Sequence, residues 1–156
     1  MNKKEMGLLA IVLFLDLATK QLISQTMTLG QSIPVIEGFF HITYVVNTGA
    51  AWSMLEGQML FFYIITFAAV ILIVWMLRET GKEAIFTRLG LVLILAGAVG
   101  NLVDRLLFQY VRDFLDFYIF GYNFPVFNVA DMSLCIGVFI TLVIVFLKKE
   151  EHHESV

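Results

Sequence analysis

Four apolar stretches, each close to twenty residues long, constrain this chain more than any other feature of its sequence. They lie at about 6–24, 59–77, 89–108 and 129–147. A helix of roughly 20 mostly apolar residues crosses about 30 Å of hydrocarbon. Because lipid offers the backbone no hydrogen-bond partners, spanning segments of this kind form helices. The sequence therefore predicts an all-α integral membrane protein, a bundle of four transmembrane helices.

The composition supports a membrane location and excludes several other classes of protein. Of the 156 residues, 60% are hydrophobic and 15% are charged, whereas soluble domains are about 25% charged. The net charge of −3 offers no basic surface for nucleic acid. Cys135 is the only cysteine, so it cannot form an intramolecular disulfide, and we interpret it as a buried packing residue. We expect a single membrane-embedded domain over residues 1–156.

Basic residues predict the orientation of the bundle. Seven of them precede the first stretch, lie near the connection between the second and third stretches, or follow the fourth: Lys3, Lys4, Arg78, Lys82, Arg88, Lys148 and Lys149. Cytoplasmic flanks carry an excess of Lys and Arg, so both termini are expected in the cytoplasm. No cleavage signal follows the first stretch, because Asp16 and Lys20 interrupt the place where it would lie. We therefore expect an uncleaved first span rather than a signal peptide.

The two segments that would face outward differ from the spans in pattern. Segment 31–53 contains the β-branched and aromatic run 39–46, closed by the turn signal Asn47-Thr48-Gly49. This pattern predicts a small β segment of one or two strands. Segment 109–128 is dense in aromatic residues, which favour the interfacial region of a bilayer. We expect it to form an interfacial belt, with a flap over a binding site as an alternative.

Polar and ionisable residues gather in one layer near the outward ends of the predicted spans. They come from three spans and both outward segments: Asp16, Lys20, Asn47, Asn101, Asp104, Arg105, Asp113, Asp116, Asn128 and Asp131. Ionisable groups inside a membrane are costly, and each marks a functional site by default. The inner half of the predicted bundle is almost purely apolar. We therefore expect a functional site near the outer face of the membrane.

The residue types in this layer favour carboxylate chemistry. The sequence has neither an H-E-x-x-H nor a G-x-S-x-G motif, and its serines lack an obvious base. His152 and His153 are adjacent in the tail, an arrangement that does not close a metal coordination sphere. Two carboxyl groups that share one proton can activate water and protonate a leaving amine. We expect no metal and no organic cofactor.

Five short motifs follow one another along the chain. They are Asp16-x-x-x-Lys20, Asn47-Thr48-Gly49-Ala50-Ala51-Trp52-Ser53, Gly100-Asn101-Leu102-Val103-Asp104-Arg105, Val111-Arg112-Asp113-Phe114 and Phe127-Asn128-Val129-Ala130-Asp131. With these motifs in this order and with four spans, the chain resembles the lipoprotein signal peptidase family, also called signal peptidase II, over almost its whole length. Each motif alone is weak, but the five together are specific. The chain departs from the family pattern at Arg112, where an apolar residue is frequent, and at Met132, where Ser is common.

The resemblance implies an intramembrane aspartic endopeptidase of the bacterial cytoplasmic membrane, with Asp113 and Asp131 at the positions of the catalytic aspartates. Its substrates would be prolipoproteins whose lipobox cysteine carries diacylglycerol, with cleavage just before that cysteine. The positions that bind substrate or support the dyad correspond to Asn47, Gly49, Asn101, Arg105 and Asn128. The resemblance also implies membrane lipids as partners and an active site near the outer face. We expect a monomer.

The two aspartates also have purely structural interpretations. Asn128-x-x-Asp131 is a capping arrangement at a helix start, with the acid at the third helical position. Such a position favours the ionised carboxylate, so we expect Asp113 to carry the shared proton. The plain interpretation of Asp113 is a loop acid paired with Arg112 or Arg105. The sequence does not decide which aspartate is the base.

Three further acids and one lysine are assigned to structural roles. Asp16 and Lys20 are spaced i, i+4 with the acid first, which suits an ion pair on a helix, and Asp104 is expected to support the same region. Asp116 would share a face with Asp113 if the segment were helical, and we interpret it as structural or interfacial.

Two other functional classes remain open at this point. Intramembrane Asp and Arg residues also form relays in proton-coupled carriers and channels. A carrier predicts polar groups at several depths, whereas here they lie in one layer. A non-enzymatic membrane adaptor would need no pair of carboxylates, so exchange of either aspartate for asparagine would leave its partner binding unchanged.

Overall fold

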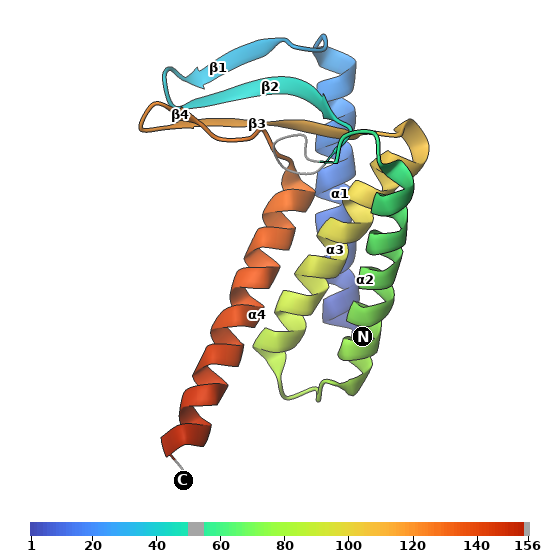
Figure 1. The fold of residues 1–156 in the computed structure, drawn as a ribbon, viewed down its shortest axis with the longest axis vertical. Helices are drawn as coiled ribbons and strands as arrows, with labels where there is room; N and C mark the ends of the chain where they lie inside the picture. The colour runs from blue at the N-terminus through green and yellow to red at the C-terminus, as the bar shows by residue number, and fades with distance from the viewer. Residues whose placement is uncertain (50–54, 155–156) are drawn as a thin grey trace.

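The computed structural model describes residues 1–49 and 55–154, with side chains up to residue 147. Within these residues, four long helices form a bundle that carries a four-stranded antiparallel sheet at one end (Figure 1). The helices are α1 (Lys3–Thr26), α2 (Met59–Glu79), α3 (Ile85–Phe108) and α4 (Val129–Glu154). The strands, in their order across the sheet, are β1 (Ser32–Ile36), β2 (Phe40–Asn47), β3 (Val111–Ile119) and β4 (Tyr122–Asn123).

All four helices are long and apolar enough to cross a membrane, as the sequence predicts. Helix α3 begins at Ile85 instead of at the predicted residue 89, so that Arg88 lies inside the helix. This is possible because the Arg88 guanidinium is bonded within the bundle. It donates to Glu5 Oε1 over 2.6 Å and to the carbonyl oxygen of Leu77 over 2.7 Å. The bonded cation therefore does not end the helix.

The outward sheet is larger than the sequence analysis predicts. The aromatic segment 109–128, expected to lie at the membrane interface, contains β3, a central strand of the sheet. Its rings explain part of this, because Phe117 stacks on Phe40 of β2 and on Phe127, with ring centroids 4.5 and 5.7 Å apart. The fold is therefore mostly helical with a substantial sheet, rather than all-α with a minor β segment.

The predicted β segment 31–53 forms the antiparallel hairpin of β1 and β2. Strand β2 continues the sheet to β3, and a bulge between Ile42 and Val45 shifts the register by one residue. Residues 50–53 of the predicted segment, and with them Ala50 of the Gly49-Ala50 step, lie outside the described residues.

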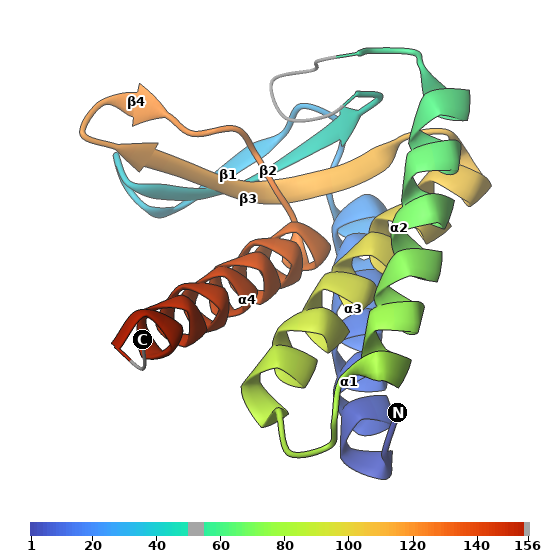
Figure 2. The same cartoon turned by 60° about the horizontal axis from the view of Figure 1, so that its bottom comes forward.

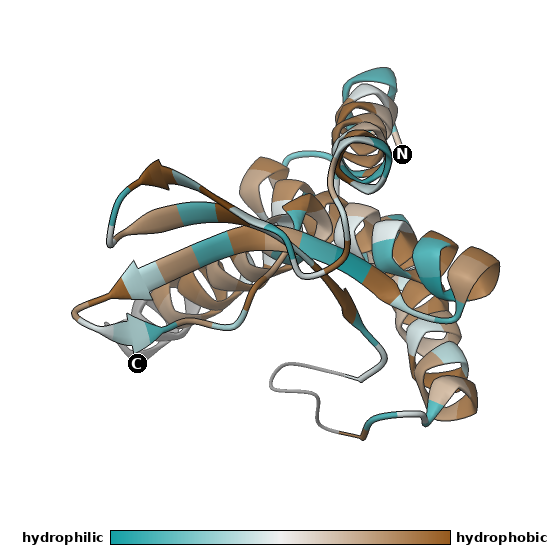
Figure 3. Ribbon diagram, turned by 90° about the horizontal axis from the view of Figure 1, so that it is seen from above, coloured by the Kyte–Doolittle hydropathy of each residue, from teal (hydrophilic) through white to brown (hydrophobic). Residues whose placement is uncertain are grey.

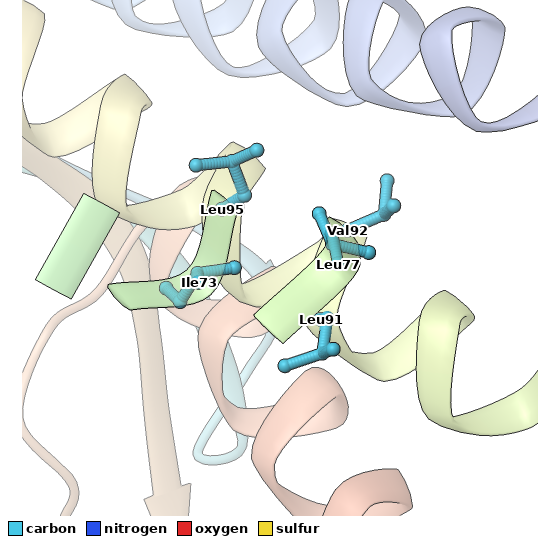
Figure 4. Close-up of a cluster of buried hydrophobic side chains, with 5 residues drawn as sticks. All are labelled: Ile73, Leu77, Leu91, Val92 and Leu95. Atoms are coloured by element: carbon cyan, nitrogen blue, oxygen red, sulfur yellow. The ribbon is translucent and has the colours of Figure 1, made fainter. Parts of the chain in front are cut away.

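The sheet and the apolar core occupy opposite ends of the molecule. Helix α1 begins and helix α4 ends at the end of the bundle away from the sheet (Figures 1 and 2). The core lies between α2 and α3 toward that same end and consists of Ile73, Leu77, Leu91, Val92 and Leu95 (Figure 4). Viewed from above, the helices are mostly hydrophobic, whereas hydrophilic stretches appear on the strands (Figure 3). The predicted polar layer therefore lies where the sheet meets the helices.

Candidate active site

The first turn of α4 fixes Asp131. The backbone N–H of Asp131 donates to Asn128 Oδ1 over 2.9 Å, and the backbone N–H of Asn128 donates to Asp131 Oδ2 over 3.2 Å. This reciprocal pair is a capping box, as the spacing predicts. The cap engages Asp131 Oδ2 and leaves Oδ1 available. That oxygen accepts a hydrogen bond of 2.6 Å from Asn101 Nδ2.

Strand β3 brings Asp113 against the same turn. Phe127 exchanges backbone hydrogen bonds of 2.8 and 3.0 Å with Leu115, which holds the chain before α4 beside β3. Asn128 Nδ2 then donates to Asp113 Oδ1 over 2.6 Å. Asn47 Nδ2 at the end of β2 donates to Asp113 Oδ2 over 3.3 Å. A single asparagine side chain is therefore bonded to both predicted aspartates.

The two carboxyl groups lie in unequal environments. Burial raises the pKa of Asp113 to about 7, and the negative charge of Asp131 adds to this shift. Hydrogen bonds from Asn128 and Asn47 to the Asp113 carboxylate oppose the shift. Asp131 instead lies in the first turn of a helix, where the helix dipole favours a carboxylate. Unequal environments of this kind allow one carboxyl group to hold a proton while the other is ionised.

A buried ion pair on α1 supports the residues that hold the two aspartates. Lys20 is completely buried, and its Nζ lies 2.8 Å from Asp16 Oδ2 in the predicted i, i+4 pair. The same Nζ donates to Asn101 Oδ1 over 3.0 Å, which orients the amide that contacts Asp131. Asp16 Oδ1 accepts from the backbone N–H of Ala130 over 2.9 Å. Helix α1 therefore satisfies one of the open amide groups at the start of α4.

Arg105, in the last turn of α3, lines the same cavity as the two carboxyl groups. Its Nη2 donates to the carbonyl oxygen of Gly49 over 3.3 Å, and its guanidinium carbon lies 4.8 Å from the centre of the Phe62 ring. Among the described residues, Arg105 Nε is buried without a hydrogen-bond partner. This arginine therefore has a donor left for a further group.

Asp104 points the other way from Arg105 and is completely buried. It forms an ion pair of 2.7 Å with Arg112, and Lys20 Nζ lies 3.7 Å from its other oxygen. The ion pair that the structure shows for Arg112 thus involves Asp104 instead of Asp113. Sequence reasoning missed this pair, because it considered Arg112 only as a neighbour of Asp113.

Asp116 lies on the other face of the sheet from Asp113. Residues three apart on a strand point to opposite faces, so the shared helical face considered above does not exist. Asp116 is buried, and its Oδ2 accepts a hydrogen bond of 2.6 Å from Thr43 Oγ1. It is separated from the dyad by the strand itself and provides a matched control for Asp113.

A cavity of about 560 Å³ opens beside the two aspartates. Six of the predicted site residues line it: Asn47, Gly49, Asn101, Arg105, Asp113 and Asp131. Asn128, Asp16 and Lys20 lie behind this wall, where they are buried and bond to lining residues or to the first turn of α4. Asp104 is buried one step farther back, paired with Arg112 and near Lys20. The structure therefore brings all ten predicted residues into one region and divides them into a lining and a support.

The rest of the cavity wall is largely apolar, and sequence reasoning missed it. It comprises Val111, the run 124–127 and one side of α4. Cys135 belongs to this wall and is exposed, so its assignment as a buried packing residue is wrong. The i, i+4 spacing of Asp131 and Cys135 was the available signal, because it places both on one helix face.

Comparison with known proteins shows to which family the chain belongs. The family profile described as "Signal peptidase (SPase) II" matches residues 8–147. The lipoprotein signal peptidase of Bacillus pumilus (strain SAFR-032) is 44% identical over 145 residues, which cover 93% of this chain and 94% of that protein. The lipoprotein signal peptidase of Bacillus subtilis (strain 168) is 45% identical over 145 residues, with 90% and 94% covered. The chain belongs to the signal peptidase II family.

Solved structures support this membership. Two structures described as a bacterial membrane enzyme, determined by the in meso method at 2.3 and 1.9 Å resolution, superimpose with TM-scores of 0.89 and 0.84. Each is 41% identical to this chain; the first match covers 96% of this chain and 90% of the other, the second 91% and 92%. As a member of this family, the chain is an aspartic endopeptidase of the bacterial membrane. The carrier and adaptor alternatives are set aside.

Proposed function

We propose that Asp113 and Asp131 are the catalytic dyad of this signal peptidase II, and that they cleave prolipoproteins just before a diacylglyceryl-modified lipobox cysteine. The observation that carries the assignment is the Asn128 side chain, which bonds to both residues at the wall of the cavity. Asp131 takes up the capping position and Asp113 faces it from the sheet. No other pair of acids borders this cavity among its lining residues.

The chemistry follows from the unequal environments of the two carboxyl groups. Ionised Asp131 accepts a proton from a water molecule, and the water oxygen attacks the scissile carbonyl carbon. Protonated Asp113 donates a hydrogen bond to the developing oxyanion. When the carbon–nitrogen bond breaks, the leaving amine takes the proton that Asp131 accepted from the water, Asp113 keeps its own proton, and the new carboxyl end departs. The dyad returns to its singly protonated state, so the step requires no metal and no organic cofactor.

The remaining predicted residues take supporting or binding roles in this proposal. Asn101 holds Asp131 Oδ1, and Lys20 holds the orientation of the Asn101 amide. Arg105 lines the cavity, and its Nε has no hydrogen-bond partner within residues 1–49 and 55–154, so the guanidinium has a donor for a substrate carbonyl group. Asn47 and Gly49 form the sheet side of the same wall.

The apolar part of the wall fits the lipid on the substrate. Residues 124–127 and the exposed face of α4 near Cys135 surround the polar groups on the open side. The signal helix of the prolipoprotein enters from the bilayer beside α4, and the acyl chains of its modified cysteine lie against these apolar surfaces. Membrane lipids occupy the same surfaces between turnovers.

We further propose that both termini are cytoplasmic, that the dyad lies near the outer face, and that residues 1–156 act as one monomeric domain. The start of α1, the end of α4 and the connection between α2 and α3 lie at the end of the bundle away from the sheet (Figure 1). The seven basic residues named above belong to these parts of the chain. Labelling of single introduced cysteines with a membrane-impermeant maleimide in intact cells tests the orientation. Labelling at the α2–α3 connection without permeabilisation would contradict it.

The dyad is tested by cleavage of a diacylglyceryl-modified lipobox peptide with purified protein in detergent. Asp113→Asn and Asp131→Asn are each expected to lower kcat by about 10³-fold or more, since each removes one of the two acid–base groups. Asp116→Asn is the matched control, because it changes a buried aspartate of the same strand on the other sheet face. It is expected to retain activity within about threefold of the wild type.

Product analysis completes this test. Cleavage must fall before the modified cysteine, and the unmodified peptide must be a much poorer substrate. Activity that survives in a folded Asp113→Asn or Asp131→Asn protein would refute the dyad. Cleavage elsewhere in the peptide would refute the proposed bond while leaving the family membership intact.

A further inference from the structure

Arg112 is a buried cation that precedes the proposed catalytic Asp113 directly in the sequence. Arg112 is 4% exposed. Its side chain lies on the face of β3 opposite to Asp113, toward α1 and α3. We propose that Arg112 is a positioning residue, which sets the place of Asp113 through a fork of hydrogen bonds to Asp104 and keeps the buried charges behind the dyad in balance. This inference rests on the proposed function of the dyad.

The first observation is the number of bonds between Arg112 and Asp104. Arg112 Nε donates to Asp104 Oδ2 over 3.1 Å, and Nη2 donates to Oδ1 over 2.7 Å. The backbone N–H of Arg112 also donates to Asp104 Oδ2, over 3.0 Å. A bidentate pair restricts direction as well as distance. Side chain and backbone of Arg112 are thus both fixed to the end of α3, and the next α-carbon, that of Asp113, lies only about 3.8 Å farther along the chain.

The same guanidinium reaches a second helix. Arg112 Nη1 lies 3.2 Å from Gln21 Oε1 and 3.3 Å from Ser24 Oγ, both on α1. The ring of Phe108 covers the guanidinium, with 4.6 Å from the ring centre to the guanidinium carbon. One side chain therefore joins β3 to α1 and α3, the two helices that also supply Lys20 and Asn101. A lysine cannot reproduce this, because it lacks the planar fork.

The second observation is the charge balance. Behind the dyad lie two acids and two bases, Asp16 with Lys20 and Asp104 with Arg112. Without Arg112, the two carboxylates would share the single ammonium of Lys20. That ammonium now lies 2.8 Å from Asp16 and 3.7 Å from Asp104. An unpaired Asp104 would draw Lys20 toward itself and away from its 3.0 Å bond to Asn101 Oδ1.

Loss of the bond between Lys20 and Asn101 would also affect the position of Asp131. Asn101 Oδ1 accepts from Lys20 Nζ over 3.0 Å and from Asn128 Nδ2 over 3.1 Å, so loss of the lysine leaves a single donor to orient the amide that contacts Asp131. Arg112 therefore acts on Asp113 through the backbone and on Asp131 through the buried network. The described charged groups nearest the dyad are Lys20 from α1 and Asp104 and Arg105 from α3, while β2 contributes the uncharged Asn47 and Arg112 acts from the opposite face of β3.

The experiment compares Arg112→Met and Arg112→Lys with the control Arg88→Met. Arg88 is also a buried arginine in an ion pair, with Glu5 at the far end of the bundle, so its loss costs comparable stability without touching the network. Each purified protein is assayed in detergent with the diacylglyceryl-modified lipobox peptide over about pH 5 to 9 to separate kcat from KM. Thermal unfolding and the fraction of folded protein are measured on the same samples.

Arg112→Met is expected to lower kcat by about 10- to 100-fold with KM changed less than about threefold. The extra uncompensated negative charge makes ionisation of the dyad harder, so the acidic limb of the rate profile is expected to move up by about one pH unit. Arg112→Lys keeps the charge and loses the fork, so the limb stays in place while kcat falls severalfold. Arg88→Met is expected to unfold at lower temperature with kcat and the limb unchanged.

Wild-type kcat in folded Arg112→Met, or an effect confined to KM, would overturn the positioning role. If Arg112→Met does not fold, Arg112→Lys decides, and wild-type kcat in that variant would overturn it equally. A fall in kcat of the same size in Arg88→Met would show that any loss of stability has this effect, which would also overturn it. Failure of the proposed dyad is visible separately, as activity in Asp113→Asn or Asp131→Asn.

Discussion

Two helices of this protein begin with the same local motif and put it to different uses. Helix α1 starts with Asn2-x-x-Glu5 and helix α4 with Asn128-x-x-Asp131, and both form reciprocal capping boxes. At α1 the acid also meets the guanidinium of Arg88, at 2.6 Å, which neutralises it. At α4 the free carboxylate oxygen meets the amide of Asn101, at 2.6 Å, and the cavity. The partner across the fold, and not the cap itself, makes an acid available for chemistry.

The largest expected effect comes from removing the capping asparagine at each helix. Asn2→Ala and Asn128→Ala both lose a cap, which costs about 1 kcal/mol of stability. Asn128→Ala also removes the 2.6 Å bond to Asp113 and is expected to lower kcat by about 100-fold or more. Peptide cleavage and thermal unfolding, measured side by side, check this. Equal activities of the two variants would mean that both caps are purely structural.

Two glycine substitutions test the support of the α4 cap and are expected to have a smaller effect on kcat. A Cβ at Gly100 would lie 2.7 Å from Asp16 Oδ2, and one at Gly137 would lie 2.6 Å from the carbonyl oxygen of Gly90. Gly100→Ala therefore displaces the acid that caps α4, whereas Gly137→Ala disturbs packing between α3 and α4 away from the dyad. We expect about a tenfold loss of kcat per folded molecule in Gly100→Ala and little in Gly137→Ala. Similar losses in both would reduce the effect to helix packing.

The pH dependence of the reaction should come from the dyad and not from the capping box of α1. Because the pKa of Asp113 is raised to about 7, the proton that the dyad must hold is lost above this pH. We expect kcat/KM of the wild type to fall as the pH rises through about 7, approaching tenfold per unit. Glu5→Gln, the equivalent change in the α1 cap, should leave this limb in place. A limb that moves with Glu5→Gln would show that the two regions are coupled.

The raised pKa of Asp113 also predicts a pH-dependent change in stability. The folded chain keeps the Asp113 proton up to about pH 7, whereas an unfolded carboxyl group releases it near 3.8. The stability that this group contributes is therefore complete below pH 3.8 and is lost as the pH rises through 7, by at most about 4 kcal/mol. Asp113→Asn removes the loss, so its unfolding temperature should exceed that of the wild type more at pH 8 than at pH 5. A constant difference would contradict the raised pKa.

The parts of the fold that could be predicted depend on short-range patterns. The spans follow from the length of apolar runs, and the start of α4 follows from the spacing of Asn128 and Asp131. Strand β3 could not be predicted as a strand, because both of its faces carry charge. Arg112 and Asp116 point one way and Asp113 the other, so the alternation that signals a half-buried strand is absent.

The members of the site were predictable, but their contacts were not. The convergence of polar residues on one layer follows from topology, and all ten predicted residues lie in one region. The Asp104–Arg112 pair depends on where β3 begins relative to the end of α3, which no local pattern specifies. The exposure of Cys135 depends on how α4 lies beside the sheet, which is likewise a property of the whole fold.

The capping box at α4 has a consequence for the synthesis and membrane insertion of the enzyme. Asp131 reaches its position only when the first turn of α4 has formed, and that turn is completed by Asp16 from the first helix to be synthesised. A nascent chain whose last helix has not yet entered the bilayer therefore has no paired carboxyl groups. With Asp113 and Asp131 as the proposed dyad, the protease is therefore expected to be inactive until α4 has folded against α1, because the two carboxyl groups meet only at that step.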